Sequence, residues 1–186
     1  MKKLISLCLA LSLLLPAWAV LGSAQTTLVV DNGDSGFSTD SLWTESWCAS
    51  GYYGHSYLHD GGPEPRPGGW AKWTPEIETA GDYQIYLLWT SCQKRAGDVP
   101  IEVRHQNGTD TGKYADQTRH GGEWVYVGTY PLSAGERCYV KISAENAGYT
   151  IADAAKFVYV PPGAAPEPPD GTPRVNARDS FPLVQQ

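Results

Sequence analysis

The residues with the clearest capacity for catalysis stand together in His55-Ser-Tyr-Leu-His-Asp60. A hydroxyl beside histidines and a carboxylate can act as a nucleophile with a base, the pairing found in hydrolases. No Gly-x-Ser-x-Gly elbow surrounds Ser56, and adjacency in sequence does not create triad geometry. His55 and His59 have the i, i+4 spacing of a helical metal pair, but glycines flank the segment, and on a strand the two would lie about 13 Å apart. We therefore expect neither catalysis nor a bound metal ion here.

Other catalytic arrangements have equally little support. Twenty acidic residues make some pair of carboxylates suited to glycoside cleavage available by chance. The chain is short for a substrate cleft, so a small hydrolase remains a minor alternative. The glycines stand at turns rather than between a strand and a helix, and no nucleotide cofactor is expected.

Aromatic side chains are more informative, because the chain has seven Trp and eleven Tyr but three Phe. Trp43 and Trp73 fall inside strand-like runs and are expected in the core. The Gly-rich segment between them carries Tyr52, Tyr53 and Tyr57, which we expect to present exposed rings. Flat rings pack against the C–H faces of sugars, and polar groups at their edge bind hydroxyls. The surface predicted from these rings, with His59 and Asp60 as polar partners, suits a carbohydrate.

Asp31, Asp34 and Asp153 raise the question of a structural calcium ion, which is held by oxygen ligands. Asp31 ends the first strand-like run and Asp153 lies in the last. The alternative is a turn cap for Asp31 and a buried hydrogen bond for Asp153. We favour this second interpretation, and the predicted metal site is none.

The elements that must position these residues are strands. Short β-prone runs alternate with turn clusters such as Gly61-Gly-Pro63 and Gly121-Gly122, and no amphipathic helix is evident. In Tyr83-Gln-Ile-Tyr-Leu-Leu-Trp89, every second residue shares one face. The pattern predicts an all-β protein, a single β-sandwich of jelly-roll or galactose-binding-like type. About nine strands are expected, at 27–31, 41–46, 69–74, 82–91, 99–105, 111–117, 124–131, 137–143 and 149–159.

The two ends of the chain differ in composition from this middle part. Residues 1–24 have the charged start, apolar stretch and small residues of a signal peptide, which predicts a secreted or periplasmic protein with no membrane span. Residues 25–160 form the predicted domain. From Pro161 onward the chain is Pro-rich and then polar, so residues 161–186 are expected to be a disordered tail, available as a spacer or as a ligand for a protein partner.

Three cysteines follow the predicted leader. Cys138 alternates with Val140 and Ile142, which places it on the inward face of a strand. Cys48 and Cys92 both lie near strand ends beside turns, and export permits one disulfide. We predict a Cys48–Cys92 bond, with pairings that involve Cys138 as the alternatives.

Charge excludes one class of partner. The chain has 14 Lys and Arg against 20 Asp and Glu, a net charge of −6, and no basic run. Nucleic acids and anionic membrane surfaces attract basic proteins, so neither is an expected partner.

A series of short motifs in fixed order resembles the golvesin-type domain, also described as a xanthan-lyase carbohydrate-binding-like domain. The similarity covers about residues 28–160. The motifs are Val29-Val-Asp-Asn-Gly-Asp-Ser-Gly-Phe37, Gly51-Tyr-Tyr-Gly54, Tyr57-Leu-His-Asp60, Ala71-Lys-Trp-Thr-Pro75, Gly81-Asp-Tyr83, Arg95 with Val99-Pro100, Gly121-Gly-Glu-Trp124, Gly128-Thr-Tyr130 and Ile151-Ala-Asp-Ala-Ala-Lys-Phe157.

The resemblance implies an extracellular β-sandwich that binds carbohydrate without catalysis. Carried over to this chain, it draws attention to residues 51–60 and to Lys72, Trp73, Arg95 and Trp124. We predict an exported, non-catalytic module that binds polysaccharide through Tyr52, Tyr53 and Tyr57, with His59, Asp60 and Arg95 as polar partners. The alternative is a protein–protein or structural module of the cell envelope.

Overall fold

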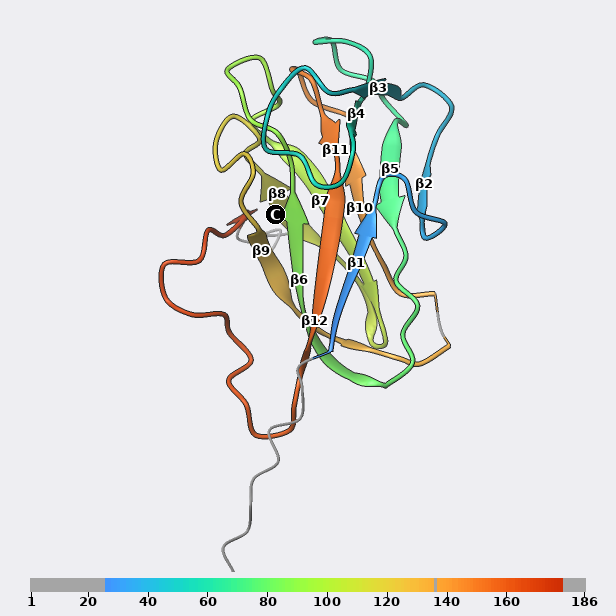
Figure 1. Ribbon diagram of the computed structural model, residues 1–186, viewed down its shortest axis with the longest axis vertical. Coiled ribbons are helices and arrows are strands. Elements are labelled where there is room, and N and C mark those ends of the chain that lie inside the picture. The colour runs from blue at the N-terminus through green and yellow to red at the C-terminus, as the bar shows by residue number, and fades with distance from the viewer. Residues whose placement is uncertain (1–25, 136, 179–186) are drawn as a thin grey trace, which may run out of the picture.

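The computed structural model describes residues 26–135 and 137–178. Within these ranges the chain forms strands and loops and no helix (Figure 1). The thirteen strands are β1 (Thr27–Asp31), β2 (Phe37–Thr39), β3 (Thr44–Ser46), β4 (Tyr57–His59), β5 (Trp70–Trp73), β6 (Gly81–Leu88), β7 (Val99–His105), β8 (Gly108–Ala115), β9 (Val125–Leu132), β10 (Tyr139–Ser143), β11 (Ile151–Ala152), β12 (Ala154–Val160) and β13 (Asn176–Ala177).

These strands form three antiparallel sheets. A four-stranded sheet has the order β1-β12-β6-β9, and a six-stranded sheet has the order β13-β8-β7-β10-β5-β2. A small third sheet, β11-β4-β3, lies at one end of the molecule, the upper end in Figure 1. The predicted all-β sandwich is confirmed, and its topology brings the first strand beside the last long one.

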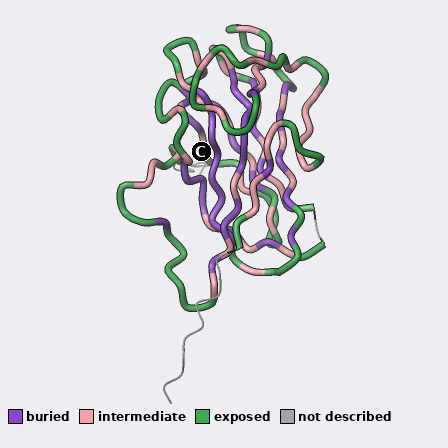
Figure 2. The backbone as a smooth tube through the Cα atoms, in the orientation of Figure 1, coloured by how far each residue is buried: buried purple, intermediate pink, exposed green. Residues whose placement is uncertain are grey.

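The core lies between the two larger sheets, where the buried parts of the chain gather (Figure 2). Alternation along each strand decides which side chains enter it, because successive residues point to opposite faces. Tyr83, Ile85 and Leu87 of β6 are buried there, as the period-2 pattern predicts. Trp73 of β5 is also a core residue, and its indole N–H donates to the Asp153 carbonyl at 3.1 Å.

The observed strands refine the predicted ones. The run predicted at 149–159 divides into β11 and β12, because Asp153 interrupts the ladder between them. Three short strands, β2, β4 and β13, are additional. Each has two or three residues, too few for alternation to show in a sequence.

The C-terminal segment differs most from expectation. Residues 161–178, predicted to be disordered, leave β12, run back past β6 and β9, and end in β13 on the edge of β8 (Figure 1). The Val175 amide donates to the Tyr126 carbonyl at 3.0 Å, and the Tyr126 amide donates to the Pro173 carbonyl at 2.8 Å. The segment therefore pairs with the free edges of β9 and β8, which would otherwise expose unpaired backbone groups.

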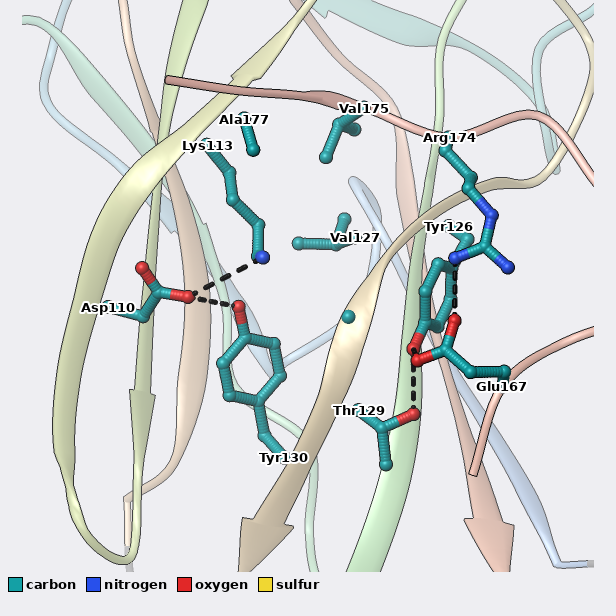
Figure 3. A pocket seen from close by; sticks show the side chains of 11 residues that line it. Asp110, Lys113, Tyr126, Val127, Thr129, Tyr130, Glu167, Arg174, Val175 and Ala177 are labelled. Atoms are coloured by element: carbon teal, nitrogen blue, oxygen red, sulfur yellow. Dashed lines mark hydrogen bonds and ion pairs between the residues drawn. The ribbon is translucent and has the colours of Figure 1, made fainter. Parts of the chain in front are cut away.

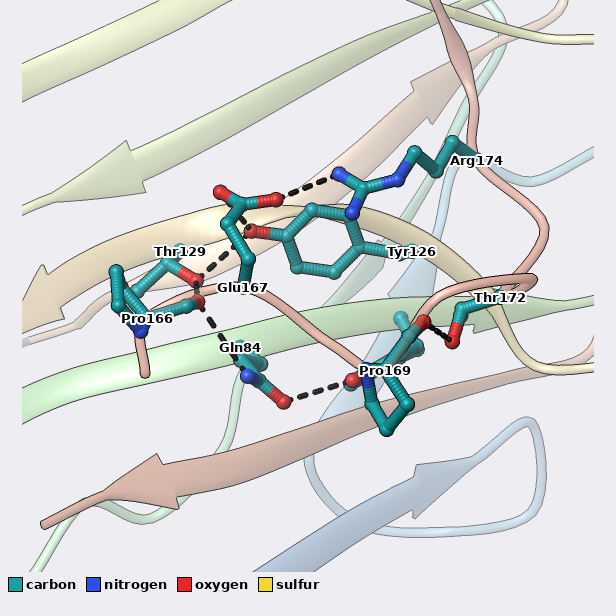
Figure 4. Close-up of polar contacts among 9 residues, drawn as sticks. Gln84, Tyr126, Thr129, Pro166, Glu167, Pro169, Thr172 and Arg174 are labelled. Carbon is teal, nitrogen blue, oxygen red and sulfur yellow. Dashed lines mark hydrogen bonds and ion pairs between the residues drawn. The ribbon is translucent and has the colours of Figure 1, made fainter. Parts of the chain in front are cut away.

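Proline carbonyls explain why a Pro-rich segment can be ordered here. Proline lacks an N–H but keeps a carbonyl acceptor. Pro166 accepts from the Gln84 side-chain amide at 3.3 Å and also from the Thr129 hydroxyl, and Glu167 accepts from the Tyr126 hydroxyl at 3.2 Å (Figure 4). The composition of residues 161–178 indicated disorder because it does not reveal these acceptors.

Two further predictions concern the ends of the chain. The predicted signal peptide, residues 1–24, and the final residues 179–186 lie outside the described part. Among the residues that the structure describes, no helix is long and apolar enough to cross a membrane.

Candidate functional site

The third sheet and its loops form one end of the molecule, and most of the sequence-predicted site residues lie there. The long loop between β3 and β4, residues 47–56, is the main feature of this end (Figure 1). Gly51 in this loop has φ of 91° and lies against the backbone of Gly122, where a Cβ would approach within 3.1 Å. Glycine is required at this crossing for two reasons. Another residue would have to adopt a left-handed backbone conformation, and its side chain would occupy space that the Gly122 backbone already fills.

Tyr57 holds the loop end together from inside. It is 2% exposed, and its hydroxyl accepts from the Ala49 amide at 3.3 Å and from the Arg95 guanidinium at 3.2 Å. The guanidinium also lies 5.4 Å from the Tyr57 ring centre and donates to Thr90. The expectation that Tyr57 presents an exposed ring is wrong, because alternation on β4 turns it into the core.

His59 and Asp60 are close to this group. His59 packs edge-on against Tyr149, with ring centres 5.5 Å apart, and its Nδ1 accepts from the Gly61 amide at 3.1 Å. Burial lowers the pKa of His59, and the Arg95 charge adds to this effect. Asp60 is 4% exposed, and burial raises the pKa of its carboxyl. Asp60 is therefore a buried residue of the loop end, whereas His59 retains partial exposure.

Exposed rings occur on the same loops. Trp47 is 67% exposed and Tyr53 is 40% exposed, whereas Tyr52 is half-buried with its ring centre 6.0 Å from that of Tyr57. Tyr53 lies 5.7 Å from Trp124, ring centre to ring centre. Trp47, Tyr52, Tyr53 and Trp124 are called the loop-end rings below. The sequence-based set of ligand-contacting residues omits Trp47, although its place beside Gly- and Ser-rich loop residues was a signal for it.

The backbone beneath Tyr53 is fixed by Asp153. The Tyr53 amide donates to one carboxylate oxygen of Asp153 at 3.1 Å, although the two residues are far apart in sequence. Asp153 is fully buried, and burial, with the Asp31 charge nearby, raises the pKa of its carboxyl to about 8. The hydrogen bond expected for Asp153 is thus observed. Within the described ranges, no three carboxylate, His or Cys side chains gather as they would around a metal ion.

The predicted disulfide is a second correction. Cys48, Cys92 and Cys138 are all free thiols. Cys138 is buried, as its alternation predicts, while Cys48 and Cys92 are exposed, each in its own turn. The Cys48 amide donates to Ser46 Oγ at 3.4 Å, and the Cys92 carbonyl accepts from the Arg95 amide at 3.0 Å. Cys48 and Cys92 both lie near strand ends, as predicted, but this shared position does not place their sulfur atoms in a disulfide bond.

A pocket of about 480 Å³ lies away from the loop-end rings, where the C-terminal segment meets β8 and β9 (Figure 3). Its charges neutralise each other: Asp110 accepts from the Tyr130 hydroxyl at 2.5 Å and lies 3.7 Å from Lys113. Arg174 pairs with Glu167 at 2.6 Å across the Tyr126 ring (Figure 4). Glu167 and Arg174 fasten the segment to Tyr126 of β9, while Asp110 joins β8 to β9 through Tyr130, and these polar groups are already partnered.

Comparison with known proteins gives consistent results. The chain is 36% identical over 142 residues to a xanthan lyase from Bacillus sp. (strain GL1), a match that covers 72% of this chain but 15% of the lyase. The solved structure of a Paenibacillus xanthan lyase superposes with a TM-score of 0.69 at 37% identity, over 73% of this chain and 13% of that one. The chain thus corresponds to a small part of these enzymes.

Two more distant structures share the fold. A family 35 carbohydrate-binding module from Clostridium thermocellum superposes with a TM-score of 0.52 at 15% identity, over 71% of this chain and 97% of the module. A Podospora anserina GH26-CBM35 β-(1,4)-mannanase superposes with a TM-score of 0.51 at 16% identity, over 77% of this chain and 29% of that one. At these identities the likeness shows the sandwich alone.

A family model described as the Golvesin C-terminal domain matches residues 28–159, in agreement with the resemblance carried by the sequence motifs. The match spans both larger sheets except β13. This chain belongs to the Golvesin C-terminal domain family.

Proposed function

We propose that this protein is a non-catalytic module that binds polysaccharide through the loop-end rings. The observation that carries the proposal is the exposure of Trp47 and Tyr53 on a loop whose backbone is anchored by the Tyr57 hydroxyl and the Asp153 carboxylate. Exposed rings of this size lose water favourably when a sugar face covers them. Similarity to part of a xanthan lyase and the fold shared with a carbohydrate-binding module support the same class of ligand.

The polar groups at this end refine the residue assignment. Tyr52 and Tyr53 remain proposed ring contacts and His59 a proposed hydrogen-bonding partner. Tyr57 and Asp60 are not proposed as ligand contacts, since their side chains are buried, and Tyr57 supports the loop through the Ala49 amide. Arg95 binds Tyr57 and Thr90 through one nitrogen, so its role is to fix the position of these residues.

A binding role is favoured over hydrolysis by the contacts of the residues with catalytic potential. The Ser56 hydroxyl donates to a Glu45 carboxylate oxygen at 2.7 Å, and His59 receives a backbone amide on Nδ1. Ser56 is buried as well. In this arrangement the Ser56 hydroxyl donates its hydrogen bond to a carboxylate and not to a histidine, so the His-Ser-His cluster of the sequence is not assembled as a triad.

The test is an equilibrium binding measurement on a panel of soluble and insoluble polysaccharides, with Trp fluorescence as the readout. Saturable binding without loss of polymer is expected. Trp47→Ala and Tyr53→Ala should each weaken it by about tenfold or more, which is about 1.4 kcal/mol per variant. Leu42→Ala is the matched control, because Leu42 is 61% exposed at the same end but has no ring.

The competing function is a protein-interaction module, for which the exposed Leu42 and Trp47 would form an apolar contact. A protein partner that stays bound in excess polysaccharide, together with no glycan binding, would replace the proposed function by this one. Export to the periplasm or the medium remains part of the proposal, tested by locating the protein in fractionated cells.

A further inference from the structure

A groove of about 940 Å³ runs over the outer face of the six-stranded sheet, and none of the loop-end rings lines it. Its floor is formed by β2, β5, β7 and β10, and its wall by residues 74–78 after β5. The side chains of interest are Lys72, Arg104, Arg137 and Tyr139, all of which line the groove. Nothing described so far gives this groove a function.

Strand register brings these groups together. β5 and β10 alternate between buried and half-exposed residues, which puts Trp70 and Lys72, and then Tyr139 and Lys141, on the outer face. Lys72 is opposite Lys141 across the β5–β10 pair, and Tyr139 is opposite Arg104 across β10–β7. Like charges on directly opposed residues are unfavourable in a sheet unless a carboxylate neutralises them.

A protein carboxylate neutralises one of the two opposed lysines, Lys141, and leaves the other, Lys72, without an ion pair among the described residues. Lys141 pairs with Glu102 at 2.8 Å, and Glu102 also accepts from the Tyr139 hydroxyl at 2.6 Å. Lys72 instead lies between two rings, 5.3 Å from the centre of Trp70 and 5.4 Å from that of Tyr139. Among the described residues, no carboxylate lies within 4 Å of the charged nitrogens of Lys72 or Arg104.

The two carboxylates that line the groove, Glu76 and Glu78, are exposed on its wall and form no ion pair within the described part of the chain. Three cations, Lys72, Arg104 and Arg137, thus line the groove against these two carboxylates, a positive balance in a chain of net charge −6. The contrast with the pocket beside the C-terminal segment is direct, since there each cation has a carboxylate within 4 Å.

We propose that this groove is a binding site for a carboxylate-bearing polysaccharide, with Lys72 and Arg104 taking the sugar carboxylate. A guanidinium binds a carboxylate through two parallel N–H groups, and an ammonium held between rings is already ordered for a single charged contact. Arg137 at the margin of the groove would contact a neighbouring sugar, and Glu76 and Glu78 would accept hydrogen bonds from sugar hydroxyls. The inference rests on the proposed function, to which it adds a second surface and a charge class of ligand.

The test compares two probes with one backbone: polygalacturonate, which carries carboxylates, and its fully methyl-esterified form, which does not. The full chain should bind polygalacturonate more tightly, and the difference should shrink as salt rises. The double variant Lys72→Met, Arg104→Gln should lose about tenfold or more of the affinity for polygalacturonate, about 1.4 kcal/mol. Lys72→Arg, which keeps the charge, should retain most of it.

Lys94→Gln is the matched control, because Lys94 is an exposed cation on a loop outside the groove and its loss changes the net charge as much as the loss of either groove cation alone. If Lys94→Gln weakens binding as much per charge as the groove variants do, the attraction is general and the site is overturned. The proposal would also be overturned if dextran sulfate or an acidic polypeptide bound as tightly as polygalacturonate does. The groove would then recognise negative charge and not a sugar carboxylate.

The outcomes separate the two proposals. If neutral glycans bind in a way that depends on Trp47 and Tyr53, and carboxylates add no affinity, the groove proposal is refuted and the proposed function stands. If no glycan binds, both proposals are refuted. Loss of polygalacturonate binding in the groove variants, with neutral-glycan binding unchanged, supports both and assigns them to different surfaces.

Discussion

The outer faces of the two larger sheets are built from the same kinds of side chain and have opposite exposure. On the four-stranded sheet, Tyr86 and Tyr126 are 7% and 5% exposed, and Lys156 lies over the rings of Tyr86 and Trp124 at 4.5 and 4.7 Å. On the six-stranded sheet, Lys72 likewise lies over two rings, but the rings and the ammonium are half-exposed.

The difference comes from residues 161–178, which cover the first face and leave the second open (Figure 4). Burial lowers the pKa of Lys156, as expected for a cation removed from water without a carboxylate partner. Rings and a lysine on a sheet face therefore do not by themselves mark a ligand site. Whether another part of the chain already covers them decides whether they serve stability or recognition.

Removal of the covering segment should have the largest effect. A chain that stops after Val160 exposes Tyr86, Tyr126 and Val158, and each apolar side chain uncovered is worth roughly 1.5–3 kcal/mol. We expect the free energy of unfolding to fall by about 4.5–9 kcal/mol and the midpoint of thermal unfolding to fall by roughly 10–30 °C. Calorimetry measures both. A chain that stops after Arg178 is the control and should melt as the full chain does.

Two results would change the comparison. An unaltered melting temperature for the shorter chain would mean that the segment contributes nothing to the four-stranded sheet. New glycan binding by the shorter chain, lost again on Tyr86→Ala, would show that the segment hides a surface with the chemistry of the loop-end rings.

The fold was largely predictable from sequence, and the covering segment was not. Eight-residue strands such as β6 show their inward face through alternation, and Tyr83, Ile85 and Leu87 are in the core as predicted. Residues 161–178 contain no such period. Their order depends on carbonyls of Pro166 and Pro173 that accept from donors 37 or more residues away in sequence, and composition does not reveal these partners.

The candidate site was predictable in location and less so in detail. The Gly-rich loop with Tyr52 and Tyr53 was identified, but Tyr57 belongs to a three-residue strand whose inward face sequence does not show. Trp47 was passed over because a tryptophan in a β-sandwich is most often a core residue. The groove could not be predicted, since it depends on the pairing of β5, β10 and β7, which are far apart in the chain.

The two sheets should also differ in how protons affect them. Asp153 lies where the four-stranded sheet meets the third sheet, and its pKa is raised from 3.8 to about 8 by burial. The folded chain therefore holds a proton that the unfolded chain has released between these pH values. The stabilisation is complete below pH 3.8 and is lost as pH rises through about 8.

Asp153→Asn should abolish this dependence and raise stability at pH 8 by about 1–3 kcal/mol, because the neutral amide keeps an oxygen for the Tyr53 amide. Denaturant unfolding at pH 5, 7 and 8.5, with and without EDTA, gives the measurement. If Asp153→Asn is less stable than the parent protein at every pH, also when EDTA removes metal ions, the Asp153 carboxyl is not buried in its protonated form.

Removal of one tyrosine hydroxyl from the covered sheet face and one from the open face compares the two faces by the same chemical change. Tyr126→Phe removes the hydroxyl that contacts Thr129 at 2.8 Å and Glu167 at 3.2 Å beneath the covering segment. Tyr139→Phe removes one that donates to Glu102 on the open face. We expect a loss of about 1 kcal/mol for Tyr126→Phe and roughly half of that for Tyr139→Phe, where water replaces the lost partner. Equal losses would argue that cover makes no difference to these bonds.

The smallest expected effect is that of Glu102→Gln on the open face. Burial would raise the pKa of Glu102, but hydrogen bonds from Lys141 and Tyr139 and the Lys141 charge together lower it below 4.5. Its contribution is therefore present above pH 4.5 and is lost as pH falls through the lowered value, the reverse of the dependence at Asp153.

An ion pair that water still reaches is worth less than about 1 kcal/mol, so Glu102→Gln should reduce stability by that amount at pH 7 and by nothing at pH 2. A double-mutant cycle with Lys141→Met isolates the coupling. The same substitution should increase polygalacturonate affinity at pH 7, because it removes a negative charge from β7 beside the groove and leaves Lys141, opposite Lys72, without its carboxylate partner. Unchanged affinity, with stability altered as expected, would place the ligand away from β7 and β10.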